Sequence, residues 1–101
     1  MSNITEAREA VVARILKGEG RASQAQRKAA FDNAGLTEPL TTLIEKVVRN
    51  ARTVTDQDVA AARTSGLSED QIFELIVCAA VGQAVRQHDA ALAALEAAAK
   101  E

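Results

Sequence analysis

Hydrophobic positions recur at the spacing of an α-helix along much of the chain. The clearest case lies between residues 38 and 51, where apolar side chains are three or four positions apart. These side chains are Leu40, Leu43, Ile44, Val47, Val48 and Ala51. They fall on one face of an amphipathic helix. No segment shows the two-residue alternation of a half-buried strand, so the pattern predicts an all-α protein.

Capping residues and glycines divide the chain into five predicted helices. Their approximate ranges are 4–17, 24–33, 38–51, 56–64 and 69–98. The residues suited to the N-cap positions of the last four are Ser23, Thr37, Thr55 and Ser68. Gln71 follows Ser68 at capping-box spacing, and Gly35 is expected as the C-cap of the second helix. No linker interrupts residues 1–101, so we expect a single domain.

The last predicted helix is apolar on nearly every side. From Ile72 to Val85, only Glu74 and Gln83 are strongly polar. Such a helix must be buried nearly all round, and a chain of 101 residues has little other mass to bury it. We therefore expect a homo-oligomer that forms through the helix at 68–99. The expected contacts include Phe73, Val77, Val81 and Val85.

Composition excludes several classes of function. The net charge is −2, and the chain has two Phe, no Tyr and no Trp, so neither a basic patch nor stacking platforms for nucleic acid are expected. A single cysteine, Cys78, cannot form an intrachain disulfide or a cysteine metal cluster. The longest nearly apolar run has 14 residues, short of a membrane span. The start of the chain lacks a signal-like region, and we expect a cytoplasmic protein without metal or cofactor.

Three stretches between residues 47 and 94 form a recognisable set: 54–63 (VTDQDVAAAR), 66–75 (GLSEDQIFEL) and 79–82 (AAVG). With these stretches, residues 47–94 resemble the carboxymuconolactone decarboxylase / alkylhydroperoxidase D-like (AhpD-like) family. The resemblance implies an AhpD-like helical domain with a long C-terminal helix. Redox members carry Cys-x-x-Cys and a histidine before the glycine turn, where this chain has Ala51, Val54 and Asp58. The resemblance therefore implies a short, non-redox branch, and dithiol peroxidase activity is not expected.

Glu74 is the most suggestive candidate for chemistry. A carboxylate that faces an apolar cavity would have a raised pKa and could act as a general acid or base. The favoured alternative is a structural charge that pairs with an arginine of the preceding helices. The candidate partners are Arg49, Arg52 and Arg63. Buried acids are usually paired.

Three polar residues further along the same helix complete the candidate set. Gln83 and Arg86 belong to a polar patch that suits a subunit interface or the rim of a small pocket, and Arg86 could hold a substrate carboxylate. His88 is the single histidine, and beside Asp89 it is more often a polar helix residue than a catalytic base. Cys78, among apolar neighbours, is interpreted as a small buried hydrophobe. Arg27 and Lys28 are expected on the solvated face of the second helix.

Two functions from different classes follow from these residues. The favoured hypothesis is a non-redox AhpD-like homo-oligomer that acts as a binding or accessory protein. The alternative is a cofactor-free lyase or isomerase that acts on a small organic acid, with Glu74 and His88 as catalytic groups and Arg86 and Gln83 as binding groups. Whether the chain is an enzyme stays open. A thiol-dependent step at Cys78 ranks last.

Overall fold

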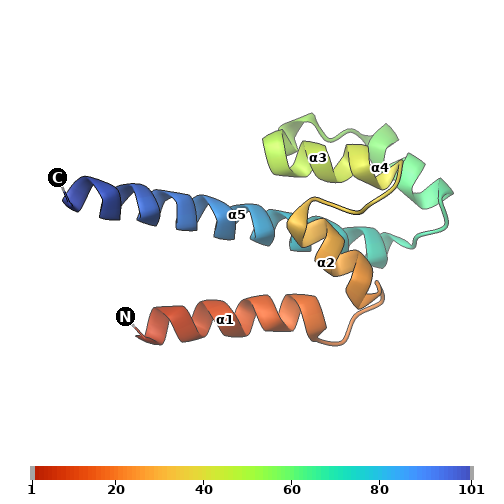
Figure 1. Cartoon of the computed structure of the whole chain (residues 1–101). Helices are drawn as coiled ribbons and strands as arrows, with labels where there is room; N and C mark the ends of the chain where they lie inside the picture. The colour runs from red at the N-terminus through yellow and green to blue at the C-terminus, as the bar shows by residue number, and fades with distance from the viewer. Residues whose placement is uncertain (1, 101) are drawn as a thin grey trace.

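The computed structural model confirms the all-helical class and the long C-terminal helix. It describes residues 2–100, with side chains from residue 6 to residue 100, so Ile4, the first residue of the first predicted helix, lies outside the described side chains. Five α-helices follow one another, and a short 3₁₀ turn, η1, joins the third to the fourth (Figure 1). Their bounds are α1 Ser2–Lys17, α2 Gln24–Asp32, α3 Leu40–Asn50, η1 Ala51–Thr53, α4 Asp56–Thr64 and α5 Glu69–Ala99.

Three of the predicted N-caps are confirmed. Ser68 and Gln71 form a reciprocal capping box at the start of α5. Thr55 does the same with Asp58 at α4. The Ser23 side chain accepts a hydrogen bond from the backbone N–H of Gln26 at the start of α2. Each cap satisfies an amide that the first helical turn leaves without a partner.

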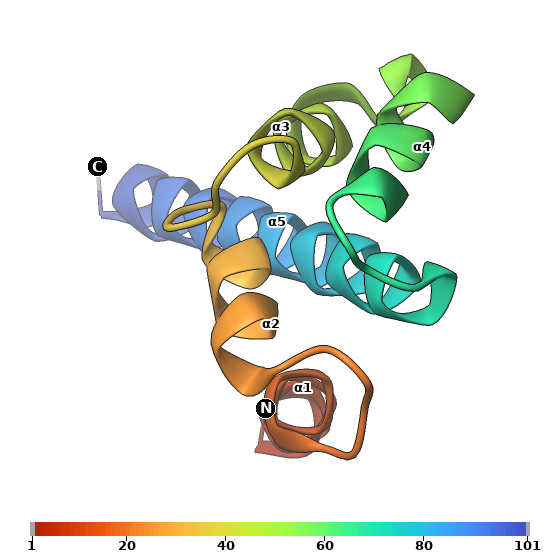
Figure 2. The ribbon, with the colours of Figure 1, turned by 90° about the vertical axis from the view of Figure 1, so that its right-hand side faces the viewer.

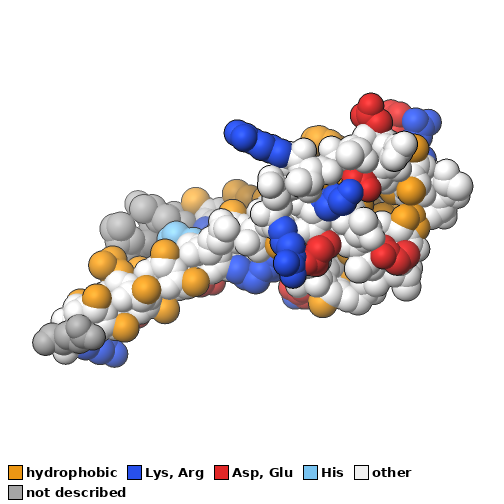
Figure 3. All heavy atoms as spheres, turned by 90° about the horizontal axis from the view of Figure 1, so that it is seen from above, with side chains coloured by type: hydrophobic (Ala, Val, Ile, Leu, Met, Phe, Trp, Pro, Cys, Tyr) orange, Lys and Arg blue, Asp and Glu red, His pale blue; other side chains and the backbone are white. Residues whose placement is uncertain are grey.

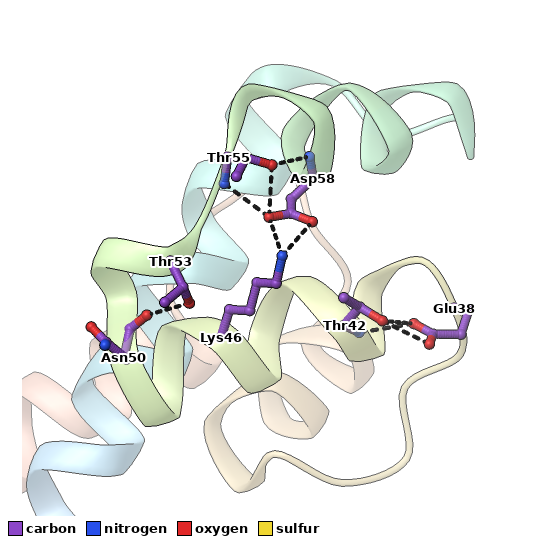
Figure 4. Close-up of polar contacts among 7 residues, drawn as sticks. All are labelled: Glu38, Thr42, Lys46, Asn50, Thr53, Thr55 and Asp58. Atoms are coloured by element: carbon purple, nitrogen blue, oxygen red, sulfur yellow. Dashed lines mark hydrogen bonds and ion pairs between the residues drawn. The ribbon is translucent and has the colours of Figure 1, made fainter.

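Two predicted helix ends are wrong. The N-cap position of α3 is Pro39, with no side-chain cap, and Thr37 does not serve as the cap. The Glu38 carboxylate instead accepts hydrogen bonds from the Thr42 amide and hydroxyl, each at 2.8 Å, and so satisfies a free donor of the first turn (Figure 4). Helix α2 ends at Asn33, whose left-handed φ of 52° takes the role predicted for Gly35. Asparagine tolerates this conformation better than most residues.

The N-terminal half of α5 is the centre of the packing. Helices α2, α3 and α4 all contact it, and α2 makes the most extensive contact (Figure 2). The largest fully buried side chains are Leu43, Ile44, Leu75 and Cys78. The apolar stripe predicted for α3 therefore faces α5, and the expected burial of Cys78 is confirmed.

Gly82 marks a close approach of α2 to α5. A Cβ atom built on Gly82 would lie 2.0 Å from the carbonyl oxygen of Phe31. The same oxygen accepts a hydrogen bond from Arg86 Nη1 at 2.6 Å. The C-terminal end of α2 is thus held against the backbone of α5 at a position where there is no room for a side chain.

Helix α5 extends well beyond the other elements. Its C-terminal part projects from the packed region, which gives the molecule a longest dimension of 52 Å (Figure 1). Helix α1 runs antiparallel to α5, because the Ile15 end of α1 lies at Cys78 whereas Arg8 lies at Asp89. Phe73, expected at an interface, is 66% exposed in the single chain.

Candidate functional site

Glu74 holds the loop between α1 and α2. Its carboxylate accepts hydrogen bonds from the backbone N–H of Arg21 at 2.8 and 2.9 Å and from that of Ala22 at 3.2 Å. A Cβ on Gly20 would lie 2.1 Å from Glu74 Oε1, so the loop comes this close because residue 20 has no side chain. The expected arginine pairing is wrong, because the partners of Glu74 are backbone amides of the first loop.

The three arginines proposed as partners are engaged in other ways or lie in another part of the fold. Arg49 pairs with Glu45, as the i,i+4 spacing predicts, and Arg63 pairs with Glu69 at 3.0 Å. Arg52 belongs to η1. A hydrogen bond from Asn33, together with Arg49, holds the pKa of Glu45 below its ordinary value. The long-range polar partners of Glu74 therefore come from a segment about 50 positions earlier in the chain.

Arg27 is buried, in contrast to the exposed position expected for it. It is 5% exposed, and its Nη1 donates hydrogen bonds to the carbonyls of Ile15 at 3.1 Å and Gly18 at 2.7 Å. These carbonyls belong to the end of α1, where a helix leaves acceptors without partners and favours a cation. Within the described part of the chain, Arg27 Nε is buried and has no hydrogen-bond partner.

The sequence does contain a signal for the burial of Arg27. Ala30, Phe31 and Ala34 follow it at i+3, i+4 and i+7, which places Arg27 on the apolar face of α2. An arginine in line with such a stripe lies over the core. Its burial then requires acceptors, and the end of α1 supplies them.

Cys78 lies beside the Ile15 carbonyl, which also accepts a hydrogen bond from Arg27. Its Sγ is 3.8 Å from the Ile15 oxygen, and the residue is almost fully buried. Burial raises the pKa of the Cys78 thiol; the nearby Arg27 charge acts in the opposite direction, and the Glu74 charge adds to the increase. The side chain is therefore a thiol rather than a reactive thiolate at neutral pH.

Glu74, Arg27 and Cys78 line one cavity between α1, α2 and α5. Its volume is about 480 Å³, and the other lining residues are Arg14, Ile15, Gly18, Glu19, Phe73 and Val77. The wall combines two arginines and two glutamates with aliphatic and aromatic surface. A concave site with apolar walls and a few converging polar groups is the usual form of a small-molecule site.

The other predicted site residues lie away from this cavity. Arg86 donates hydrogen bonds to the Phe31 carbonyl and to Gln83 Oε1. The His88 ring is largely exposed, with Nδ1 3.5 Å from Asp89 Oδ1 and 3.5 Å from Arg8 Nη1. Arg8 forms a bidentate pair with Asp89 at 2.8 and 3.1 Å, which holds the pKa of Asp89 below its ordinary value.

One protomer does not bring the predicted catalytic set together. Glu74, Arg86 and His88 all lie on the continuous helix α5, 12 and 14 positions apart. At 1.5 Å per residue, Glu74 is about 18 Å from Arg86 and about 21 Å from His88 along the axis. The lyase or isomerase alternative therefore needs residues from more than one copy, and it stays a prediction.

A separate polar network joins α3 to α4. Lys46 Nζ lies 2.8 and 3.0 Å from the two carboxylate oxygens of Asp58 (Figure 4). One of these oxygens, Oδ2, also accepts hydrogen bonds from the backbone N–H and the hydroxyl group of Thr55. The Lys46 hydrogen bond is the main cause that holds the pKa of Asp58 below its ordinary value, and the Thr55 amide adds to it. These bonds fix the position of α4 and lie outside the lining of the cavity.

The described residues contain no group of three or more His, Cys, Asp or Glu side chains arranged to hold a metal ion. Among the helices described here, none is both long and apolar enough to cross a membrane. No known protein family, curated protein or solved structure matches this chain significantly.

Proposed function

We propose that this chain is a non-redox, AhpD-like helical protein that assembles through α5 and serves as a binding or accessory protein. Its ligand is a small organic acid, and its binding site is the cavity between α1, α2 and α5. The observation that carries this proposal is the buried guanidinium of Arg27 in the wall of a cavity of about 480 Å³.

The Arg27 guanidinium lines the cavity and makes the site suitable for an anion, while its Nε–H is buried and, within the described residues, has no partner. A buried donor that lacks a partner is destabilising by about 1–3 kcal/mol. A carboxylate that enters the cavity could pair with the guanidinium by a charge-assisted hydrogen bond, which is among the stronger polar contacts in proteins. Ile15, Phe73 and Val77 offer apolar surface to the body of such a ligand.

The lining charges set a condition on this ligand. Glu19 and Glu74 would repel a carboxylate if their own charges were not offset. Glu74 is already compensated by three backbone N–H bonds. Arg14 and Arg27 balance the two acids in number, so a singly charged acid suits the cavity better than a polyanion.

The non-redox part of the proposal is supported by the thiol. Cys78 is the single cysteine of the chain, its pKa is raised by burial, and a sulfenic acid formed there would have no resolving thiol in the same chain. The oligomeric part is supported by apolar surface along α5. Phe73 is 66% exposed, and Leu92 and Leu95 are also exposed. Patches of this kind commonly mark interfaces.

Titration of ¹⁵N-labelled protein with benzoate, with benzamide as its neutral counterpart, tests the binding function. Benzoate should shift the amides of the cavity wall at millimolar concentration, and benzamide should bind at least about tenfold more weakly because it cannot form the charge-assisted bond. The variant Arg27→Lys keeps the charge but loses the planar guanidinium, and its affinity for benzoate should be about tenfold lower.

Arg52→Lys is the matched control, because Arg52 lies on η1 outside the cavity lining. Val77→Phe adds side-chain volume to the cavity wall and should lower the affinity for benzoate without altering the charge of the site. Equal binding of benzoate and benzamide, or equal effects of Arg27→Lys and Arg52→Lys, would refute the proposed site.

A further inference from the structure

The C-terminal part of α5 carries a mainly apolar stripe, interrupted by His88, whose two leucines its own chain leaves exposed. Val85, His88, Leu92, Leu95 and Ala99 follow one another at intervals of three or four residues, which places them along one side of the helix. Val85 is half-buried, whereas Leu92 is 45% exposed and Leu95 is 67% exposed. Hydrophobic side chains are visible along the whole projecting segment (Figure 3).

A second apolar feature of the same chain is a groove between α1 and α5. Its volume is about 320 Å³, and apolar side chains form most of its surface. These side chains are Val12, Ala13, Leu16, Phe31 and Val85. Arg8, Glu9 and Lys17 also line it, and Arg8 is already paired with Asp89 of its own chain.

We propose that this groove binds the segment 89–99 of a second copy of the chain. The two copies exchange these segments reciprocally, so that α1 and α5 of each copy form an antiparallel four-helix arrangement around a two-fold axis. Leu92 and Leu95 of one copy then fill the groove of the other. The inference deepens the proposed function, because it rests on the homo-oligomer and names its contact surface.

Geometry explains why the occupant is a second copy. The stripe and the groove match in apolar character, but one chain cannot bring them together. Leu95 lies ten residues beyond Val85 on a continuous helix, about 15 Å away along the axis. A two-fold axis pairs each surface with the same surface of the second copy, so the stripe and the groove of both chains are covered at once.

Charge favours the same pairing. Segment 89–99 contains Asp89 and Glu96 and no basic residue. Asp89 is engaged by Arg8 of its own chain, while Glu96 forms no ion pair within the described residues. Apart from the Arg8–Asp89 pair, the segment carries the charge of Glu96, and Lys17 in the groove of the second copy is the cation that can pair with it.

Sedimentation of the full-length protein at micromolar concentration tests the contact. The wild type should be a dimer or a larger even-numbered oligomer. Leu95→Glu should raise the dissociation constant of the dimer by at least about 100-fold, because a two-fold dimer contains the substitution twice and loses two apolar contacts. Ala94→Glu is the matched control. Ala94 is exposed and lies about 100° from Leu95 around the helix, away from the stripe, so this variant should stay within about threefold of the wild type.

A disulfide test fixes the register. In a Cys78→Ser background, Val12→Cys combined with Leu95→Cys should give a covalent dimer on mild oxidation. The two introduced thiols cannot meet within one chain, because Val12 lines the groove beside Val85 and Leu95 lies about 15 Å further along α5. Val12→Cys combined with Ala94→Cys is the control and should cross-link at least about tenfold more slowly.

Each outcome bears on the proposal. A dimer that survives Leu95→Glu, or equal cross-linking in both thiol pairs, overturns the exchanged segment while the homo-oligomer and the cavity stand. A monomeric wild type overturns the exchanged segment and the homo-oligomer together, and the benzoate titration still decides the binding function separately. Loss of the dimer with Leu95→Glu but not with Ala94→Glu supports the exchanged segment. Faster cross-linking of Val12→Cys with Leu95→Cys than with Ala94→Cys supports it as well.

Discussion

Gly82→Ala is the sharpest test of how α2 and α5 fit together. The substitution adds one methyl group on α5 at a point where a Cβ would lie 2.0 Å from the Phe31 carbonyl oxygen and 2.8 Å from its carbonyl carbon. Both atoms belong to the backbone at the end of α2, so no side-chain rotation relieves the overlap. Helix α2 must move away from α5, and the 2.6 Å hydrogen bond from Arg86 to the same oxygen must lengthen or break.

Three effects compete in the free energy of unfolding. Alanine is a better helix former than glycine, which stabilises the variant by about 1 kcal/mol. Overpacking against a fixed neighbour is destabilising by about 1–3 kcal/mol. Loss of a hydrogen bond from a charged donor adds about 1.5–3 kcal/mol in the same direction. The two unfavourable effects exceed the gain in propensity, and we expect Gly82→Ala to be less stable by about 1.5–5 kcal/mol.

Thermal and urea unfolding followed by circular dichroism, at one fixed protein concentration, measures the change. For a domain of this size each kcal/mol corresponds to about 4–8 °C in Tm, so the expected decrease is at least about 6 °C. Ala80→Gly is the matched control, because Ala80 is exposed on the same helix. It should reveal helix propensity alone, a loss of about 1 kcal/mol.

An unchanged or raised Tm for Gly82→Ala would refute the reasoning. Helix propensity would then outweigh packing at this position, and the close approach of α2 to α5 would not restrict residue 82. A loss no greater than that of Ala80→Gly would also count against the geometry, because the clash would then have little energetic consequence.

Three further predictions address the polar and thiol groups. Glu74→Gln should destabilise the chain by about 1–3 kcal/mol in urea unfolding, because one amide oxygen cannot replace a carboxylate that accepts three hydrogen bonds from backbone N–H groups. The control Glu69→Gln, at an exposed position, should change stability by less than about 0.5 kcal/mol, and equal effects of the two variants would contradict this prediction. Cys78 should react with a disulfide reagent at least about tenfold more slowly in the native than in the unfolded chain. Neither the wild type nor Cys78→Ser should consume peroxide with a dithiol reductant, and the two should have the same helical circular dichroism. Because Lys46 holds the pKa of Asp58 below its ordinary value of about 3.9, the stabilisation from this pair is fully present above that pH and is lost as the pH falls through the lowered value. Lys46→Met should therefore flatten part of the decline of Tm in acid, and an unchanged pH profile would show that the pair contributes nothing.

The sequence by itself determined the helices and most of their boundaries. Apolar residues spaced three or four apart place α3, and the nearly continuous apolar run from Ile72 to Val85 places α5, without reference to the rest of the chain. The caps Ser23, Thr55 and Ser68 act within three residues of their partners, so their role is visible in a short window. The burial of Cys78 and the Glu45–Arg49 pair follow from equally local patterns.

The candidate site was predictable in part. Glu74 stands out because it is a carboxylate on an apolar helix, and its place in the cavity wall agrees with that reading. Arg27 could have been found from its alignment with Ala30 and Phe31, but its charge suggested exposure. The cavity cannot be seen before α1 is placed against α5. The separation of Glu74 from Arg86 and His88, in contrast, follows from their spacing of 12 and 14 positions on one predicted helix.

Tertiary structure decided which groups the charged side chains meet. Glu74 binds amides of the first loop, Arg27 binds carbonyls at the end of α1, and Arg86 binds a carbonyl at the end of α2. These partners are backbone atoms, which nearly every residue carries, so they leave no mark in the sequence. A search for opposite charges looks for side chains, and for that reason it assigned Glu74 to arginines that it does not meet. Only the packing of α1 and α2 against α5 determines which backbone groups lie within reach.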